Sequence, residues 1–498
     1  ESPSQTQAEA PIERVKGGDP VPSHAASAST GAGIAARRTI RRRWLVCGGI
    51  ALLLALYVTL WAVSAFDNTN PTDLDVFFVP DVRIALAGHP LLIYSFRVED
   101  YPIANGPISF LPLTLAAWLA ARLGWLGDPH LRRMVIFIVC SPFPLLVGYE
   151  TLRVTDRLLA RPLRGVWRLL AYGAIALAPE LWHSALYYGH IEQPLLVWLM
   201  LVGIRLLIER KPLWAGTLLG LALLTRTAAV LPLLALLLVL ARWRRWNMLL
   251  RLLAGLAGTV ALVMAPFLFV DERDVIYSLV TFRSSLPVGG GNLWGVLNWP
   301  GLIGFATRYD STVTIGAALL LTVCVLVMRR DLDVDSADLY GLLALTMLCF
   351  PLFIKMLWPY YYLETYLFVA VWALARPLPY RRRGESAPPV MWVRWTWWAL
   401  GWLWPAAVLV AAQVAEYGLS SNDFLGWIGP WSLINTLLLL GTMLTLLAML
   451  LWGKPLRRWM EELATSRVAG AVGTGDEVVG DGGVSRGILM IDASSASE

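Results

Sequence analysis

Hydrophobic stretches of about 20 residues recur along most of the chain and are separated by shorter segments that carry arginine and other polar residues. Stretches of this length match the apolar core of a bilayer, so the pattern predicts an all-α polytopic membrane protein with about 12 transmembrane helices. The predicted spans are residues 44–66, 133–152, 168–188, 193–208, 212–225, 227–241, 248–270, 311–328, 338–354, 356–375, 394–416 and 430–452.

Polar composition marks both ends of the sequence. Residues 1–36 and 466–498 are rich in small and polar residues and show no hydrophobic period. Segments of this kind cannot bury enough apolar surface to fold, so both are predicted to be disordered tails. The membrane domain is therefore expected to occupy residues 37–465.

The distribution of Lys and Arg orients the predicted spans. Most basic residues fall in alternate connecting segments when the N-terminus is placed in the cytoplasm, and the positive-inside rule then places both termini there. Two large outer loops follow, residues 67–132 and 271–310. Within the first, residues 107–126 are moderately apolar, but counting them as a span would put the arginines of 153–168 outside. We therefore expect an interfacial helix at 107–126.

Composition narrows the class of protein. Hydrophobic residues make up 57% of the chain and charged residues 15%, against about 25% charged in soluble proteins, which excludes an ordinary soluble enzyme. The net charge of +6 lies beside apolar spans and favours contact with anionic membrane lipids over nucleic acid. Arginine greatly outnumbers lysine, which favours a bacterial source and hence the bacterial plasma membrane. The four cysteines lie in spans and show neither a disulfide nor a metal-ligand pattern.

Three carboxylates open the first outer loop, namely Asp73, Asp75 and Asp81. Partial desolvation at a membrane surface raises a carboxyl pKa, which suits a general base. The alternative is a solvated acidic loop that balances Arg83 and Arg97.

A second group of ionisable residues lies around the outer end of the span 168–188. Glu180 and His183 are three residues apart and share a helical face, and Tyr188, His190 and Glu192 follow. Charged groups near membrane depth are costly, so this group is a candidate substrate-binding site, although an interfacial cluster bonded to headgroups and water is the alternative. No HExxH or equivalent spacing occurs, so neither a metal site nor another cofactor is predicted; a divalent cation is possible chemically but not indicated.

Two cations could bind a phosphate. Arg226 lies between the short spans 212–225 and 227–241, which form either a helical hairpin or one interrupted helix. Its guanidinium can hold a phosphate through two donors, or it can extend to lipid headgroups. Lys355 lies in an aromatic turn near Glu364, where an aromatic belt with a Lys–Glu pair explains it equally well. A Walker P-loop and a nucleotide-binding GxGxxG are absent, which argues against an ATP-driven pump.

Several of these pieces occur together in one known superfamily. The order and spacing of four segments resembles the GT-C superfamily of polyprenyl-phosphate-sugar-dependent glycosyltransferases, most closely glycosyltransferase family 87, a bacterial mannosyltransferase-like group. The resemblance covers roughly residues 44–245. The segments are Asp73-Leu74-x-Val76-Phe77, Ala85-Leu86-x-Gly88-x-Pro90-Leu91, Gly189-His190-x-Glu192 and the run from Ala215 to Arg226.

The resemblance implies an inverting transfer of a sugar from a polyprenyl-phosphate donor to a lipid or glycan acceptor, on a GT-C-like fold. Asp73 matches the family's acidic position, with Asp75 as a near competitor. Arg226 would hold the donor phosphate, and Lys355 is a weaker candidate for that role. The paired histidines of a late outer loop in some members have no counterpart here, which leaves the acceptor side open. Mannose comes from the resemblance alone, since no residue distinguishes it from arabinose, glucose or galactose.

Two other classes of protein fit parts of the pattern. A secondary transporter or lipid flippase often has twelve spans with both termini inside, and Arg226 in a broken apolar stretch is typical of discontinuous transporter helices. Against this, the ionisable residues gather at outer span ends rather than at the midplane. A noncatalytic assembly subunit is a third possibility and predicts that Asp73 and Arg226 can be replaced without consequence.

Overall fold

The computed structural model falls into two units, Glu1–Ala55 and Leu56–Glu498, each of which is taken by itself. Both predicted tails, most of the span 44–66 and the span 394–416 lie outside the described residues. In the first unit the described residues are helical. The structure describes residues 48–50, 52, 54–57, 73–97, 102, 105–159, 163, 165–182, 184–185, 188–282, 286–289, 292–297, 299–357, 359–375 and 433–452.

The segment predicted as the first outer loop is largely helical. Its helices are η1 (Leu74–Phe78), α2 (Val79–Leu86), η2 (Pro90–Ser95), η3 (Pro107–Ser109) and α3 (Phe110–Arg122). The helix expected at 107–126 is present as η3 followed by α3. Leu111, Leu115 and Trp118 share one face of α3 and are exposed, whereas Leu113, Ala116 and Ala117 are buried. An exposed apolar face is what an interfacial helix requires.

Four helices in the described part of the chain are long and apolar enough to cross a membrane. They comprise the continuous stretch α4 (Pro129–Cys140) with α5 (Pro142–Leu158), then α11 (Trp246–Ile276), α14 (Pro300–Met328) and Leu433–Trp452. Their exposed surface is apolar at many positions; Leu262 of α11 is 78% exposed and Leu320 of α14 is 64% exposed. Side chains of this kind suit a lipid surface.

Helix α11 and helix α14 both run further than the sequence indicates. Helix α11 continues through Ile276 into η6 (Tyr277–Thr281), and α14 begins at Pro300. Much of the outer loop expected at 271–310 is therefore helical. Between the two helices lies the short α13 (Leu293–Leu297).

The other predicted spans are represented by shorter apolar helices, so the expected total of about 12 crossings stays a prediction. Within the described residues an isolated bridge between Gly289 and Met356 is the only β pairing, and the architecture is helical. The shorter helices are α6 (Val166–Ala176), α7 (Pro179–Trp182), α8 (Glu192–Ile208), α9 (Pro212–Leu223), η5 (Thr227–Ala229), α10 (Val230–Arg242), α15 (Asp338–Phe353), η7 (Pro359–Tyr362) and α16 (Leu363–Ala375).

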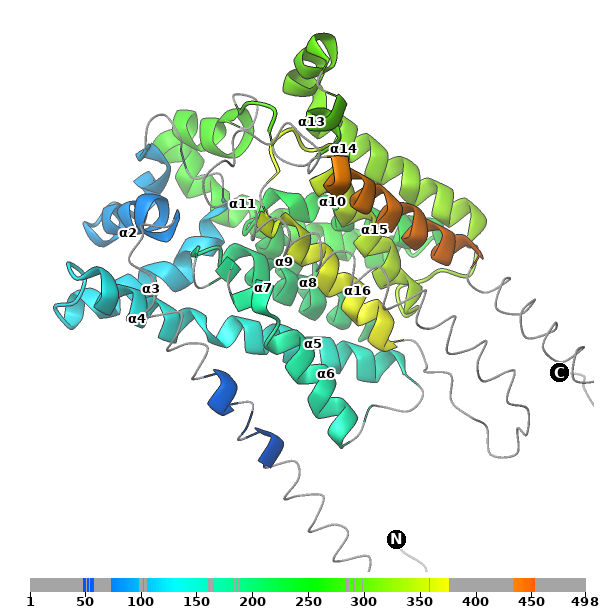
Figure 1. Cartoon of the computed structure of the whole chain (residues 1–498), viewed down its shortest axis with the longest axis horizontal. Helices are drawn as coiled ribbons and strands as arrows, with labels where there is room; N and C mark the ends of the chain where they lie inside the picture. The colour runs from blue at the N-terminus through cyan, green and yellow to red at the C-terminus, as the bar shows by residue number, and fades with distance from the viewer. Residues whose placement is uncertain are drawn as a thin grey trace, which may run out of the picture. The chain divides into compact units, whose positions relative to one another are not determined.

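Helices α8, α9, α10, α15 and α16 contribute most of the larger apolar core, and Figure 1 shows them grouped at the centre of the second unit. Helices α9 and α11 approach closely through glycines. A Cβ on Gly216 would lie 2.0 Å from the Leu252 carbonyl oxygen, and one on Gly255 would lie 2.2 Å from the Leu213 carbonyl oxygen. No larger residue fits at these crossing points.

The helical path of the chain is broken between α9 and α10. Arg226 is extended, with φ −155° and ψ 131°, so the helical path stops there and resumes at η5. Helix α9 packs against α8 and α11, while α10 packs mainly against α14 and α15. The chain at the start of η3 is hydrogen-bonded to the residues just before Arg226. The backbone N–H groups of Gly106 and Ile108 donate to the carbonyls of Thr225 (3.1 Å) and Leu224 (3.3 Å), respectively.

Candidate active site

Asp73 occupies the N-cap position of η1, immediately before the apolar residues that anchor this turn. Leu74 and Phe78 are buried in a second apolar cluster that also includes Phe110 and Ile191. Because Leu74 faces this core, Asp73 is held at the core's edge, where its side chain is 32% exposed. A carboxylate fixed in this way is accessible and yet well positioned.

A glycine brings the second half of the site against η1. Gly189 has φ +82°, a conformation that other residues rarely adopt, and a Cβ at this position would lie 2.8 Å from the Cβ of Leu74. The absence of a side chain lets the turn before α8 rest directly on η1. His190, the next residue, is thereby placed opposite Asp73.

His190 joins two carboxylates. Its Nε2 lies 3.1 Å from Asp73 Oδ2, and its Nδ1 lies 2.7 Å from Glu192 Oε1. Burial alone would lower the pKa of His190, but the charge of Glu192 and the hydrogen bonds to Asp73 and Glu192 outweigh it and raise this pKa to about 9. At neutral pH the imidazolium therefore donates through both nitrogens, to Asp73 and to Glu192.

The inner end of this group is closed to solvent. Glu192 and Gln193 begin α8 and are both buried, and the Ser184 hydroxyl donates to Gln193 Oε1 over 2.5 Å. Tyr188 stands beside the histidine, with 6.4 Å between the two ring centroids. Asp73 is thus the exposed end of a chain of polar groups that runs into the protein.

Asp75 is only two residues from Asp73 but has different partners. Its carboxylate accepts hydrogen bonds from Arg132 Nη2, at 2.8 Å, and from Arg133 Nε, at 3.0 Å. Burial would raise the pKa of Asp75, but the hydrogen bonds and charges of Arg133 and Arg132 hold it below its usual value. Asp75 thereby ties η1 to the start of α4.

Arg226 lies inside the protein and not at its surface. Its side chain is 2% exposed and pairs with the buried Glu364 of α16. The guanidinium also lies 4.5 Å from the ring centroid of Tyr361 and 5.4 Å from that of Phe350. The alternative in which Arg226 extends to lipid headgroups is therefore wrong. The Arg226–Glu364 pair lies within reach of the charge of Glu192.

Lys355 occupies a separate buried position between α14 and the loop at Gly289. Its ammonium donates to the Thr307 carbonyl at 3.2 Å, and its backbone N–H donates to Asp310 Oδ2 at 3.2 Å. Its own carbonyl accepts from Gly289 N–H at 2.8 Å and from Asn292 Nδ2 at 3.0 Å. Burial lowers the pKa of Lys355, with Asp310 acting against that shift. These bonds give Lys355 a role in holding the loop to α14.

The structure brings together Asp73, Tyr188, His190 and Glu192 from the residues that the sequence singled out. His183 and the side chain of Glu180 lie outside the described residues. Sequence reasoning missed that Glu364 is the partner of Arg226, because 138 residues separate them and no spacing rule connects them. Among the described residues, no group of three or more His, Cys, Asp or Glu is arranged to hold a metal ion.

Comparisons with known proteins add little at the level of sequence. No family model matches the chain, and no curated protein matches it. One solved structure that is similar is the crystal structure of ArnT from Cupriavidus metallidurans in the apo state, with 15% sequence identity and a TM-score of 0.44. The match covers 82% of this chain and 78% of that chain. This TM-score does not establish a shared fold, so the assignment of a function depends on the site itself.

Proposed function

We propose that this protein is an inverting glycosyltransferase of the GT-C type in a bacterial plasma membrane. It moves a sugar, expected to be mannose, from a polyprenyl-phosphate donor to a lipid or glycan acceptor at the outer face, with both termini cytoplasmic. The observation that carries the proposal is the partly exposed Asp73 carboxylate held by His190, which is itself paired with buried Glu192. This geometry suits a positioned general base.

In the proposed reaction, an acceptor hydroxyl attacks the anomeric carbon of the donor sugar. The bond from that carbon to the phosphate oxygen breaks, and polyprenyl phosphate leaves as an anion. Asp73 takes the hydroxyl proton as the new bond forms. His190 uses one carboxylate oxygen of Asp73, Oδ2, and no described residue hydrogen-bonds the other, so Oδ1 is available to the acceptor.

Asp73 is preferred to Asp75 as the base because of their partners. A general base needs a carboxylate oxygen that is free to accept a proton. Both oxygens of Asp75 are occupied by arginines, which also stabilise the ionised form of this carboxylate. Arg226 and Glu364 are assigned a positioning role behind Glu192, since the buried ion pair leaves little of the guanidinium exposed. Tyr188 remains a candidate to contact the sugar.

The test is transfer of radiolabelled sugar from a panel of polyprenyl-phosphate sugars in membranes that express the chain. Wild type is compared with Asp73→Asn and with Asp335→Asn, an exposed aspartate in the α14–α15 connection that serves as the matched control. Loss of transfer in Asp73→Asn alone, at equal expression, supports the proposal. Equal transfer in all three proteins contradicts it. Lipid scrambling in liposomes without transfer from any donor would support the flippase instead.

A further inference from the structure

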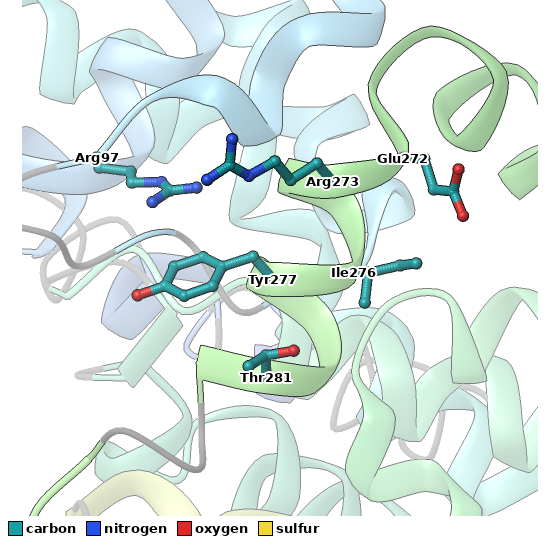
Figure 2. Close-up of a pocket in the computed structure, with 6 residues that line it drawn as sticks. All are labelled: Arg97, Glu272, Arg273, Ile276, Tyr277 and Thr281. Carbon is teal, nitrogen blue, oxygen red and sulfur yellow. The ribbon is translucent and has the colours of Figure 1, made fainter.

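A cavity of about 420 Å³ lies at the far end of α11 from the glycine contacts. It is lined by Arg97, which follows η2, and by residues of α11 and η6. Arg273, Tyr277 and Thr281 follow one another at intervals of four residues along its wall. Figure 2 shows Arg97 and Arg273 extending toward each other above the ring of Tyr277.

The two guanidinium groups differ in their acidic partners. That of Arg97 is paired with an acidic side chain, and that of Arg273 is paired with none among the described residues. Arg97 pairs with Asp274 at 2.5 Å and lies 4.2 Å from the Tyr277 ring centroid. Asp271 is directed to the backbone N–H of Asp274, at 3.4 Å. Glu272 also lines the cavity, and its carboxylate lies on the opposite side of the helix from the two arginines (Figure 2). Arg273 is exposed, and no described residue forms an ion pair with it.

Large apolar side chains are exposed close to Arg273 in the sequence. Phe269 is 93% exposed, Val280 is 70% exposed and Ile276 is 42% exposed, all within a few residues of Arg273. Exposed apolar side chains of this size on a membrane-length helix suit hydrocarbon. A ligand that satisfies both features carries an anionic head and an apolar chain.

We propose that this cavity binds the phosphate of an amphiphilic lipid. Arg273 and Arg97 hold the phosphate through paired N–H donors, and the hydrocarbon lies along Phe269, Ile276 and Val280. The identification of this lipid as the polyprenyl-phosphate donor rests on the proposed function, whereas a phospholipid offers the same chemistry. The site is distinct from Arg226 and Lys355, which are buried and bound to protein groups.

Native mass spectrometry of the full chain tests the proposal, with undecaprenyl phosphate and undecaprenol as the lipids added. Arg273→Gln is compared with wild type, with Arg273→Lys and with Arg251→Gln, an exposed arginine at the other end of α11. Loss of charge-assisted hydrogen bonds predicts about tenfold weaker binding of undecaprenyl phosphate to Arg273→Gln. Arg251→Gln should bind as wild type does, and Arg273→Lys should fall between.

Two results would overturn the proposal. One is equal binding of undecaprenyl phosphate to Arg273→Gln and wild type, and the other is binding of the neutral undecaprenol as tight as that of the phosphate. Competition with phosphatidylglycerol then shows which lipid the site binds. If phosphatidylglycerol displaces undecaprenyl phosphate, the cavity is a general site for phospholipid headgroups. If it does not, the cavity is a site for the polyprenyl-phosphate donor. Asp73→Asn keeps the lipid affinity in either case, so failure of the proposed reaction and failure of this site are measured independently.

Discussion

Asp73 and Asp75 lie two residues apart on the same short helix but belong to different chemical environments. Asp73 is partly exposed and faces a single imidazolium that is shared with Glu192. Asp75 is held by two arginines from α4. The difference shows how one acidic segment can supply both an accessible carboxylate and a structural one. A π-helical turn in η1 places successive acids toward different neighbours.

The largest expected effect is a loss of sugar transfer, and it distinguishes Asp73 from Asp75. Asp73→Asn should lower sugar transfer by roughly 10²–10⁴-fold, because an amide cannot accept the proton, while the melting temperature changes little. The measurement is initial transfer rate alongside a thermal melt in detergent. A variant that retains more than half of the wild-type rate would mean that the base lies elsewhere.

The second prediction concerns stability. Asp75→Asn should destabilise the protein by about 3 kcal/mol, because Arg132 and Arg133 would be left as unpaired, largely buried charges. The double variant Arg133→Gln with Asp75→Asn should recover part of that loss, since it removes one of the two unpaired charges. Chemical denaturation followed by tryptophan fluorescence measures both. An unchanged midpoint in Asp75→Asn would show that the arginine contacts contribute no stability.

The third prediction uses the pH dependence of His190. Its pKa is raised to about 9, so its charged form stabilises the fold fully below pH 6.5, and that contribution is lost as pH rises through about 9. Transfer by wild type should fall over the same range as Asp73 loses its cationic partner. Glu192→Gln removes the main cause of the raised pKa and should move this fall to lower pH. A profile identical in Glu192→Gln and wild type would contradict the assignment.

The smallest effect concerns Asp81, the third acid of the same segment. It is fully buried, and neither carboxylate oxygen has a hydrogen-bond partner among the described residues. Burial raises the pKa of Asp81 to about 8, so the folded state binds a proton that the unfolded state has lost above about pH 4. Stability should therefore decline by about 1 kcal/mol between pH 7 and 9. Asp81→Asn should lack this decline in a thermal melt; an equal decline in both proteins would assign it to other groups.

The helical, membrane-spanning character of the chain could be predicted from apolar length, and the contacts within the site could not. The helix at 107–126 and the break at Arg226 follow from local pattern, because one-sided hydrophobicity and a polar interruption are properties of adjacent residues. The contact between Asp73 and His190 spans 117 residues, and no spacing rule reports it. The positive φ of Gly189 depends on how closely Leu74 approaches. The hydrogen bond from the Lys355 backbone N–H to Asp310 likewise joins residues 45 positions apart.

The glycine contacts between α9 and α11 have a mechanical consequence for the lipid site. They clamp α11 at one end, whereas the apolar part of this helix is otherwise little covered, with only 11% of its most hydrophobic window buried. Between this clamp and the cavity the helix bends, because Asp271 has the non-helical angles φ −148° and ψ 59°. The clamp therefore fixes the part of α11 before the bend, and the part that carries Arg273 is joined to it through the kink. The wall of the lipid site can thus change its angle without any change at the glycine contacts.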